Sequence, residues 1–147
     1  MAIGGVVTDL DKGDVLGPVE YTLSPFVVRE YCHAVELHQP CFQGVLGELV
    51  MPPTLIHLDK LRLYRHACPA GTGPTARIHF EYDCEVFAPV RVGDRLRVRG
   101  EVTERYEKNG RDYVVLVMEL SNADTGTLLI RYQDKVILAY REASKAA

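Results

Sequence analysis

The chain has 147 residues, 47% of them apolar and 25% charged, which is the balance of a soluble globular protein and excludes a disordered or fibrous chain. We therefore expect a single domain over residues 1–147, large enough to fold around its own core. The net charge of -3 supplies no broad basic surface, so we expect no nucleic acid and no anionic membrane as a main partner.

The start of the chain and its cysteines indicate a cytoplasmic protein. Residues 1–14 contain only a short apolar run, interrupted by Asp9 and Asp11, which fits neither a signal peptide nor a membrane anchor. The cysteines form no Cys-x-x-Cys pair and lack metal-ligand spacing. We therefore expect no metal, no cofactor and reduced thiols at Cys32, Cys41, Cys68 and Cys84.

A Ser-Pro pair predicts where the first helix begins. Ser24 is a favoured N-cap residue, and Pro25 suits the first helical position because its missing N–H has no intrahelical partner there. From Phe26 to Leu37, apolar residues cover most of the circumference of a helix. This pattern predicts a helix that is buried on most of its sides.

A second helix is predicted from Thr54 to about Ala67. Its apolar positions follow helical spacing through Leu55, Leu58 and Leu61, with charged and histidine side chains on the other faces. We expect this helix to lie beside the first one or at the loop that leaves it.

Beyond a Pro/Gly-rich loop at 69–75, apolar residues alternate with polar ones, which is the period of a strand. The first such segment, 77–87, has a wet face that includes His79 and an apolar face formed by Ile78, Phe80, Tyr82, Cys84 and Val86. Further strands are predicted at 95–104, 112–120 and 128–140, with turns at Asn109-Gly110 and at 122–126.

The order of these elements indicates an α+β fold. A nearly all-apolar helix followed by at least four long antiparallel strands buries its apolar surface when the sheet wraps its dry face around the helix. This is the hot-dog architecture, a long antiparallel β-sheet around a central buried helix.

Three segments resemble the MaoC-like hydratase/dehydratase family. The sequence PVRVGDRLRVRGEV at 89–102 is similar to the family's strand-entry motif. The sequence YCHAVELHQPCF at 31–42 aligns without a gap on the hydratase motif Y-A-x-A-T-G-D-x-N-P-x-H. The sequence LVMPPTL at 49–55 is similar to the APPT segment of type I fatty acid synthase dehydratase regions and of mycobacterial-type hydroxyacyl dehydratase subunits.

This resemblance implies an acyl thioester of CoA or acyl carrier protein, in fatty acid or polyketide metabolism. In the family, an Asp and a His hold the water that adds to an enoyl thioester or leaves a 3-hydroxyacyl thioester. Here these two positions are Leu37 and Phe42, neither of which transfers protons. The resemblance assigns substrate binding to Tyr31, Leu37, Gln39, Phe42, Pro52, Pro53 and Thr54. It also implies a homodimer, or a heterodimer with a catalytic MaoC-like chain.

Three residues are candidates to replace the missing pair. His57 follows the Pro-Pro-Thr segment, near the position where the family supplies oxyanion donors, although a lone histidine is more often structural. Glu36 and His38 flank Leu37, but one residue rotates a helix position by about 100°. The remaining histidines, His33, His66 and His79, are interpreted as surface or interface residues.

Four functional hypotheses remain open at this stage. The favoured one is a subunit of hydratase/dehydratase type that has lost its catalytic pair and contributes binding surface. The second is an active dehydratase or isomerase that uses His57 or Glu36. A hot-dog thioesterase ranks below these because it needs a carboxylate to activate water, and only Glu36 and Glu48 lie in suitable segments. A scaffold role predicts no small-molecule cleft.

Overall fold

The computed structural model describes residues 4–45, 47, 49–70 and 78–138. Its described strands form one antiparallel sheet with the order β1-β3-β4-β5-β2. Their bounds are Val15–Thr22 for β1, Ile78–Val86 for β2, Arg95–Lys108 for β3, Arg111–Asn122 for β4 and Leu128–Leu138 for β5. The α-helices are Pro25–Ala34 (α1), Pro40–Gln43 (α2) and Ile56–Ala67 (α3), with 3-10 turns at Val7–Asp9 and Pro53–Leu55.

The strands predicted downstream of the loop are confirmed as β2 to β5. The Asn109-Gly110 hairpin joins β3 to β4, and both of its residues have positive φ, 53° and 73°, as a type I′ turn requires. Part of the predicted loop at 69–75, residue 77 and residues 139–140 of the last predicted strand lie outside the described residues.

One strand, β1, was not predicted. It pairs with β3, and its register shifts between Leu16 and Val19 around a Gly-Pro pair. Proline cannot donate to a sheet ladder and is tolerated at a sheet edge, where β1 lies. The Gly-Pro pair therefore interrupts the strand pattern in the sequence, although the strand still forms.

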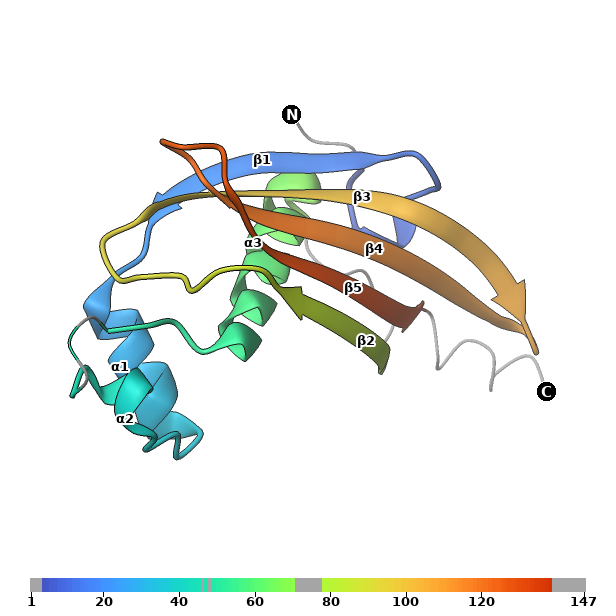
Figure 1. Ribbon diagram of the computed structural model, residues 1–147. Helices are drawn as coiled ribbons and strands as arrows, with labels where there is room; N and C mark the ends of the chain where they lie inside the picture. The colour runs from blue at the N-terminus through green and yellow to red at the C-terminus, as the bar shows by residue number, and fades with distance from the viewer. Residues whose placement is uncertain (1–3, 46, 48, 71–77, 139–147) are drawn as a thin grey trace.

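The central helix is α3, so the prediction that the helix beginning at Pro25 is central is wrong. Figure 1 shows α3 against the sheet, with α1 and α2 together at one end of the molecule. In α1 only Val28 and Cys32 are buried, while Phe26 is 69% exposed. Arg29 interrupts its apolar circumference, which leaves one narrow buried stripe.

The close packing of α3 on the sheet depends on two glycines. A Cβ added at Gly100 would lie 3.0 Å from one methyl group of Leu63, and a Cβ added at Gly17 would lie 2.9 Å from the other methyl group. Leu63 is completely buried between them. The helix thus approaches β1 and β3 directly.

Within the described residues, no helix is long and apolar enough to cross a membrane. The same residues contain no cluster of His, Cys, Asp and Glu that could hold a metal ion. Cys32, Cys41, Cys68 and Cys84 are free cysteines.

Candidate functional site

Two adjoining pockets lie where the segment leading into α3 meets β2 and β5. The larger, of about 370 Å³, is lined by Phe42, Val50, Met51, Pro53, Val86, Phe87, Ala88, Pro89, Val90 and Ile130. The smaller, of about 230 Å³, is lined by Pro53, Thr54, Ile56, His57, Tyr82, Cys84, Val86 and Tyr132. Because Pro53 and Val86 belong to both walls, the two pockets adjoin. We call them the apolar pocket and the His57 pocket.

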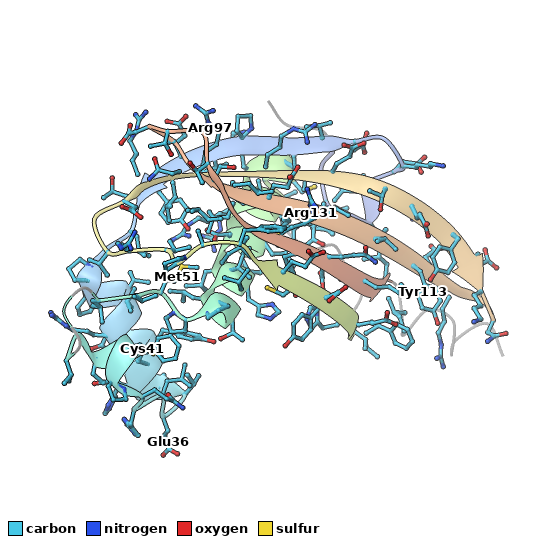
Figure 2. The ribbon with its side chains drawn as sticks, in the orientation of Figure 1. Glu36, Cys41, Met51, Arg97, Tyr113 and Arg131 are labelled. Carbon is cyan, nitrogen blue, oxygen red and sulfur yellow. The ribbon has the colours of Figure 1, made fainter. Side chains whose placement is uncertain are left out.

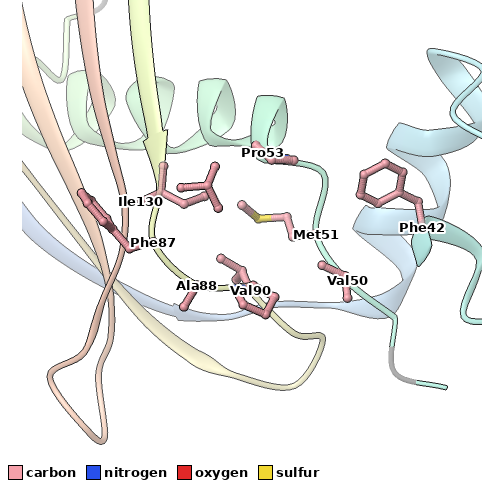
Figure 3. A pocket seen from close by; sticks show the side chains of 10 residues that line it. Phe42, Val50, Met51, Pro53, Phe87, Ala88, Val90 and Ile130 are labelled. Carbon is pink, nitrogen blue, oxygen red and sulfur yellow. The ribbon is translucent and has the colours of Figure 1, made fainter. Parts of the chain in front are cut away.

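The apolar pocket contains one of the two positions that the sequence motif singles out. Figure 3 shows Phe42 on one side of this pocket, opposite Phe87 and Ile130. Leu37 is partly buried and packs against the hydrophobic core. The lining side chains are hydrocarbon or thioether, which suits an alkyl chain and offers no group to hold a water.

Short backbone contacts hold the walls of the apolar pocket together. The Met51 N–H donates to the Val90 carbonyl over 2.8 Å, and Val50 forms an isolated bridge with Arg91. The Tyr31 hydroxyl lies 2.6 Å from Oγ1 of Thr54, which links α1 to the turn before α3. Two predicted binding residues therefore have a structural link beside the site.

The other predicted binding residues occupy different surroundings. Pro53 lines both pockets and Thr54 lines the His57 pocket. Pro52 is buried beside them, whereas Gln39 is exposed at the N-terminus of α2. The structure thus brings the Pro-Pro-Thr segment to the site and leaves Gln39 on the surface.

Glu36 and His38 do not join His57. Glu36 is exposed just beyond α1 with a φ of 57°, and Figure 2 shows it at the far end of the molecule from the sheet. His38 lines a separate polar pocket together with Arg29, Glu30, His33 and Gln43. Of the three predicted catalytic candidates, only His57 lines a pocket that adjoins the apolar pocket.

His57 is part of a network of polar side chains from α3, β2 and β5. Its Nδ1 lies 3.2 Å from the Tyr132 hydroxyl. That hydroxyl lies 3.3 Å from His79 Nε2, and His79 Nδ1 lies 2.7 Å from Asp134 Oδ1. Lys60 Nζ lies 3.1 Å from the other carboxylate oxygen of Asp134. We call these five residues the His57 network.

The network is buried at one end and open at the other. The side chain of Asp134 is fully buried and that of Lys60 is 11% exposed, whereas that of His79 is 38% exposed. Burial lowers the pKa of His57, Lys60 and His79 lower it further, and Asp134 opposes them. Burial, followed by the charge of Asp134, raises the pKa of Tyr132 well above its usual range. His57 is therefore a neutral imidazole, and Tyr132 a protonated phenol, near pH 7.

Four members of this network were not identified as site residues in the sequence. His79 is interpreted from the sequence as a surface or interface residue, and it is exposed, but its contacts with Tyr132 and Asp134 are not predicted, because a register shift between His79 and Glu81 breaks the alternation along β2. Its ring stacks with that of Tyr82, at a centroid distance of 6.0 Å. A readable signal did exist in β5, where Asp134 interrupts the buried series Ile130, Tyr132, Val136 and Leu138.

Neither family models nor curated protein sequences show a match to this chain. Solved structures do. The 3R-hydroxyacyl-ACP dehydratase complex HadBC from Mycobacterium tuberculosis aligns with a TM-score of 0.72 and 22% identity, over 87% of this chain and 97% of that one. The (R)-hydratase from A. caviae, involved in PHA biosynthesis, aligns with a TM-score of 0.69 and 19% identity, over 90% and 99% of the two chains.

A third structure, the MaoC-like dehydratase from Rhodospirillum rubrum, aligns with a TM-score of 0.65 and 18% identity, over 91% of this chain and 96% of that one. The chain therefore has the α+β hot-dog fold of MaoC-like dehydratases and (R)-hydratases. This confirms the predicted fold class.

Proposed function

We propose that the protein handles an acyl thioester of CoA or of acyl carrier protein, as a hydratase/dehydratase-type subunit that has lost the water-holding pair. The observation that carries this proposal is the apolar pocket beside Phe42. Its volume and lining suit the alkyl part of such a substrate. The hot-dog fold and the motif at 31–42 support the same substrate class.

Loss of water addition follows from the side chains at the two motif positions. Adding water to an enoyl thioester requires one group that takes a proton from water and another that delivers a proton to the α carbon. Leu37 and Phe42 do neither. The side chains that line the apolar pocket around Phe42 also carry no polar group that would order a water. We therefore expect the chain alone not to hydrate enoyl thioesters.

The exposed side chains of β2 support an oligomer. This strand is at the edge of the sheet, and Phe80, Tyr82 and Val86 are each about half exposed, as is the following Phe87. A long edge strand with apolar side chains is a template for pairing with another chain. We propose a homodimer, or a heterodimer with a MaoC-like chain that retains the pair; the HadBC structure is itself described as a complex.

A second candidate, an active dehydratase or isomerase with replacement residues, is favoured by one observation. His57 is held by the Tyr132 hydroxyl beside a pocket that adjoins the apolar one. Glu36, the other replacement considered, is exposed away from both pockets. Among the described residues nothing favours a thioesterase: Glu36 has this remote position, and Glu48 lies outside them.

Binding of octanoyl-CoA tests the proposal without requiring turnover. Ala88 lines the apolar pocket, so Ala88→Trp fills it and is expected to weaken binding about 10-fold or more, since several methylenes lose their contacts. Ala34→Trp is the matched control, because Ala34 is exposed at the end of α1 and lines neither pocket. Isothermal titration calorimetry gives the affinities. Absence of binding by the unmodified chain, or equal binding by both variants, contradicts the proposal.

A further inference from the structure

We propose that His57 is a general base that moves a proton between the α and γ carbons of a β,γ-unsaturated acyl thioester, with its ring oriented by Tyr132, His79 and Asp134. The chain would thus carry a double-bond isomerase site in the His57 pocket. This inference rests on the proposed function for the identity of the thioester. It deepens the second candidate function, because it specifies the double-bond position of the substrate, the path of the proton and three positioning residues, Tyr132, His79 and Asp134.

The order of hydrogen bonds fixes which nitrogen of His57 is free. A carboxylate only accepts, so the 2.7 Å contact requires His79 to donate its Nδ1–H to Asp134. The Tyr132 hydroxyl then donates its proton to His79 Nε2, 3.3 Å away, or to Asp134 Oδ1, 3.5 Å away. With its proton engaged there, Tyr132 accepts the Nδ1–H of His57 over 3.2 Å. His57 Nε2 is left without a proton, as a base requires.

Two other contacts are consistent with this order. The Tyr132 hydroxyl also lies 3.5 Å from Asp134 Oδ1, and donation to that oxygen would equally leave His57 as the donor at Nδ1. Lys60 Nζ lies 3.1 Å from His79 Nδ1 as well as from Asp134 Oδ2. Because His79 Nδ1 carries a proton in this arrangement, Lys60 pairs with the carboxylate instead. The ammonium and the carboxylate then compensate each other's buried charge.

The position of the network argues for chemistry rather than for stability alone. A buried ion pair rarely stabilises a fold more than apolar side chains of the same size would, because both charges lose their hydration. Here the pair is connected through His79 and Tyr132 to a half-buried histidine in a pocket wall. A titratable group in a cleft, with a lowered pKa and defined partners, has the features of a general base.

The proposed reaction transfers a proton and adds no water. In the proposed reaction, the α C–H bond breaks and its proton moves to His57 Nε2, while the electron pair forms a dienolate with the thioester carbonyl. The proton on Nε2 exchanges with water, a proton is then delivered from Nε2 to the γ carbon, where a C–H bond forms, and the double bond becomes conjugated with the thioester; both steps are reversible. One base suffices, and nothing is oxidised, reduced or consumed. The alkyl chain beyond the γ carbon extends into the apolar pocket.

Isomerisation of 3-hexenoyl-CoA by the purified full chain tests the inference. Absorbance of the conjugated thioester is expected to rise, and in D₂O deuterium is expected at C2 and C4 of the product by NMR. His57→Gln should lower the rate by about 100-fold or more, the usual contribution of general-base catalysis. His33→Gln is the matched control, because His33 lines the separate polar pocket and should leave the rate unchanged.

The positioning residues are tested by a readout that a purely structural role would not change. The rate should rise with pH through the pKa of His57 and then level off, because the neutral imidazole is the active form. Asp134 opposes the lowering of this pKa, so Asp134→Asn should move the inflection to lower pH. Tyr132→Phe keeps the ring volume and removes the hydroxyl; it should lower the rate about 10-fold or more, and it serves if Asp134→Asn does not fold.

Octanoyl-CoA binding distinguishes failure of this inference from failure of the proposed function. A chain that binds octanoyl-CoA but neither isomerises 3-hexenoyl-CoA nor incorporates deuterium overturns the isomerase site and leaves the thioester proposal standing. A chain that binds no thioester overturns both. Isomerisation that persists unchanged in His57→Gln overturns the role of His57.

Discussion

The two walls of the proposed substrate site differ in a way that separates binding from proton transfer. The wall from α2 carries Phe42, at a motif position where the resembling family has a proton-transferring histidine. The wall from α3 and β5 carries His57 and Tyr132, backed by the fully buried carboxylate of Asp134. The first wall is apolar, and the second is connected through hydrogen bonds to a buried ion pair. Chemistry in this chain therefore has to be sought on the α3 side of the pocket.

Restoring the motif pair at positions 37 and 42 should produce the largest change. We expect the double variant Leu37→Asp, Phe42→His to gain hydration of crotonyl-CoA by about 100-fold or more over the unmodified chain, since each proton-transferring group contributes on this scale. Loss of the conjugated thioester absorbance measures the reaction. Leu37→Asp alone is the control. A double variant that folds and binds octanoyl-CoA without any gain would show that the α2 wall does not face the reacting carbons.

Breaking the buried ion pair on the other wall should have the largest effect on stability. Lys60→Met leaves the carboxylate of Asp134 buried without its ammonium partner, and we expect a loss of about 3–5 kcal/mol in the free energy of unfolding. Urea unfolding followed by circular dichroism measures it. Replacing both partners, Lys60→Met with Asp134→Leu, should recover most of the loss. A single variant as stable as the unmodified chain would show that the pair is solvated.

The hydrogen bond that links α1 to the turn before α3 should contribute less to the free energy of unfolding than the buried ion pair does. Tyr31 and Thr54 share a hydrogen bond over 2.6 Å at the surface, and such bonds contribute about 1 kcal/mol. In a double-mutant cycle of Tyr31→Phe and Thr54→Val, we expect a coupling of about this size in the free energy of unfolding. A coupling of zero would mean that the α1–α2 end is not held to the turn before α3.

The smallest expected effect is the pH dependence contributed by His57. Its pKa is lower in the folded than in the unfolded chain, so the unfolded state binds more protons in the window just below pH 6.5. Stability from this residue is complete above pH 6.5 and declines as the pH falls through that window. Between pH 5 and pH 7, the urea midpoint of unfolding should depend less on pH in His57→Gln than in His33→Gln. An identical slope in both variants would contradict the shift.

Much of the fold was readable from local patterns, and the errors have physical causes. The alternation in β3 to β5 and the Asn109-Gly110 turn predict the meander, because side-chain period and turn geometry are local properties. The choice of central helix failed, because apolar content alone does not show that Arg29 narrows the buried face of α1. What selects α3 is the approach of Leu63 to Gly17 and Gly100, which lie far from it in the sequence.

The candidate site was readable only in part. His57 was identified from its place after the Pro-Pro-Thr segment, and it lines the second pocket. His79, Tyr132 and Asp134 come from β2 and β5, so their proximity depends on strand order, and a register shift beside His79 breaks the alternation that would reveal its contacts with Tyr132 and Asp134. Only Asp134 gave a local signal, as an acid in the buried phase of β5.

Absorbance of the conjugated thioester, followed with two substrates, tests the central contrast most directly. With the purified chain, we predict that absorbance rises with 3-hexenoyl-CoA, through His57, and stays constant with crotonyl-CoA, because Leu37 and Phe42 transfer no protons. The opposite result, a constant signal with 3-hexenoyl-CoA and a fall with crotonyl-CoA, would mean that the chain hydrates without the motif pair and would contradict this account.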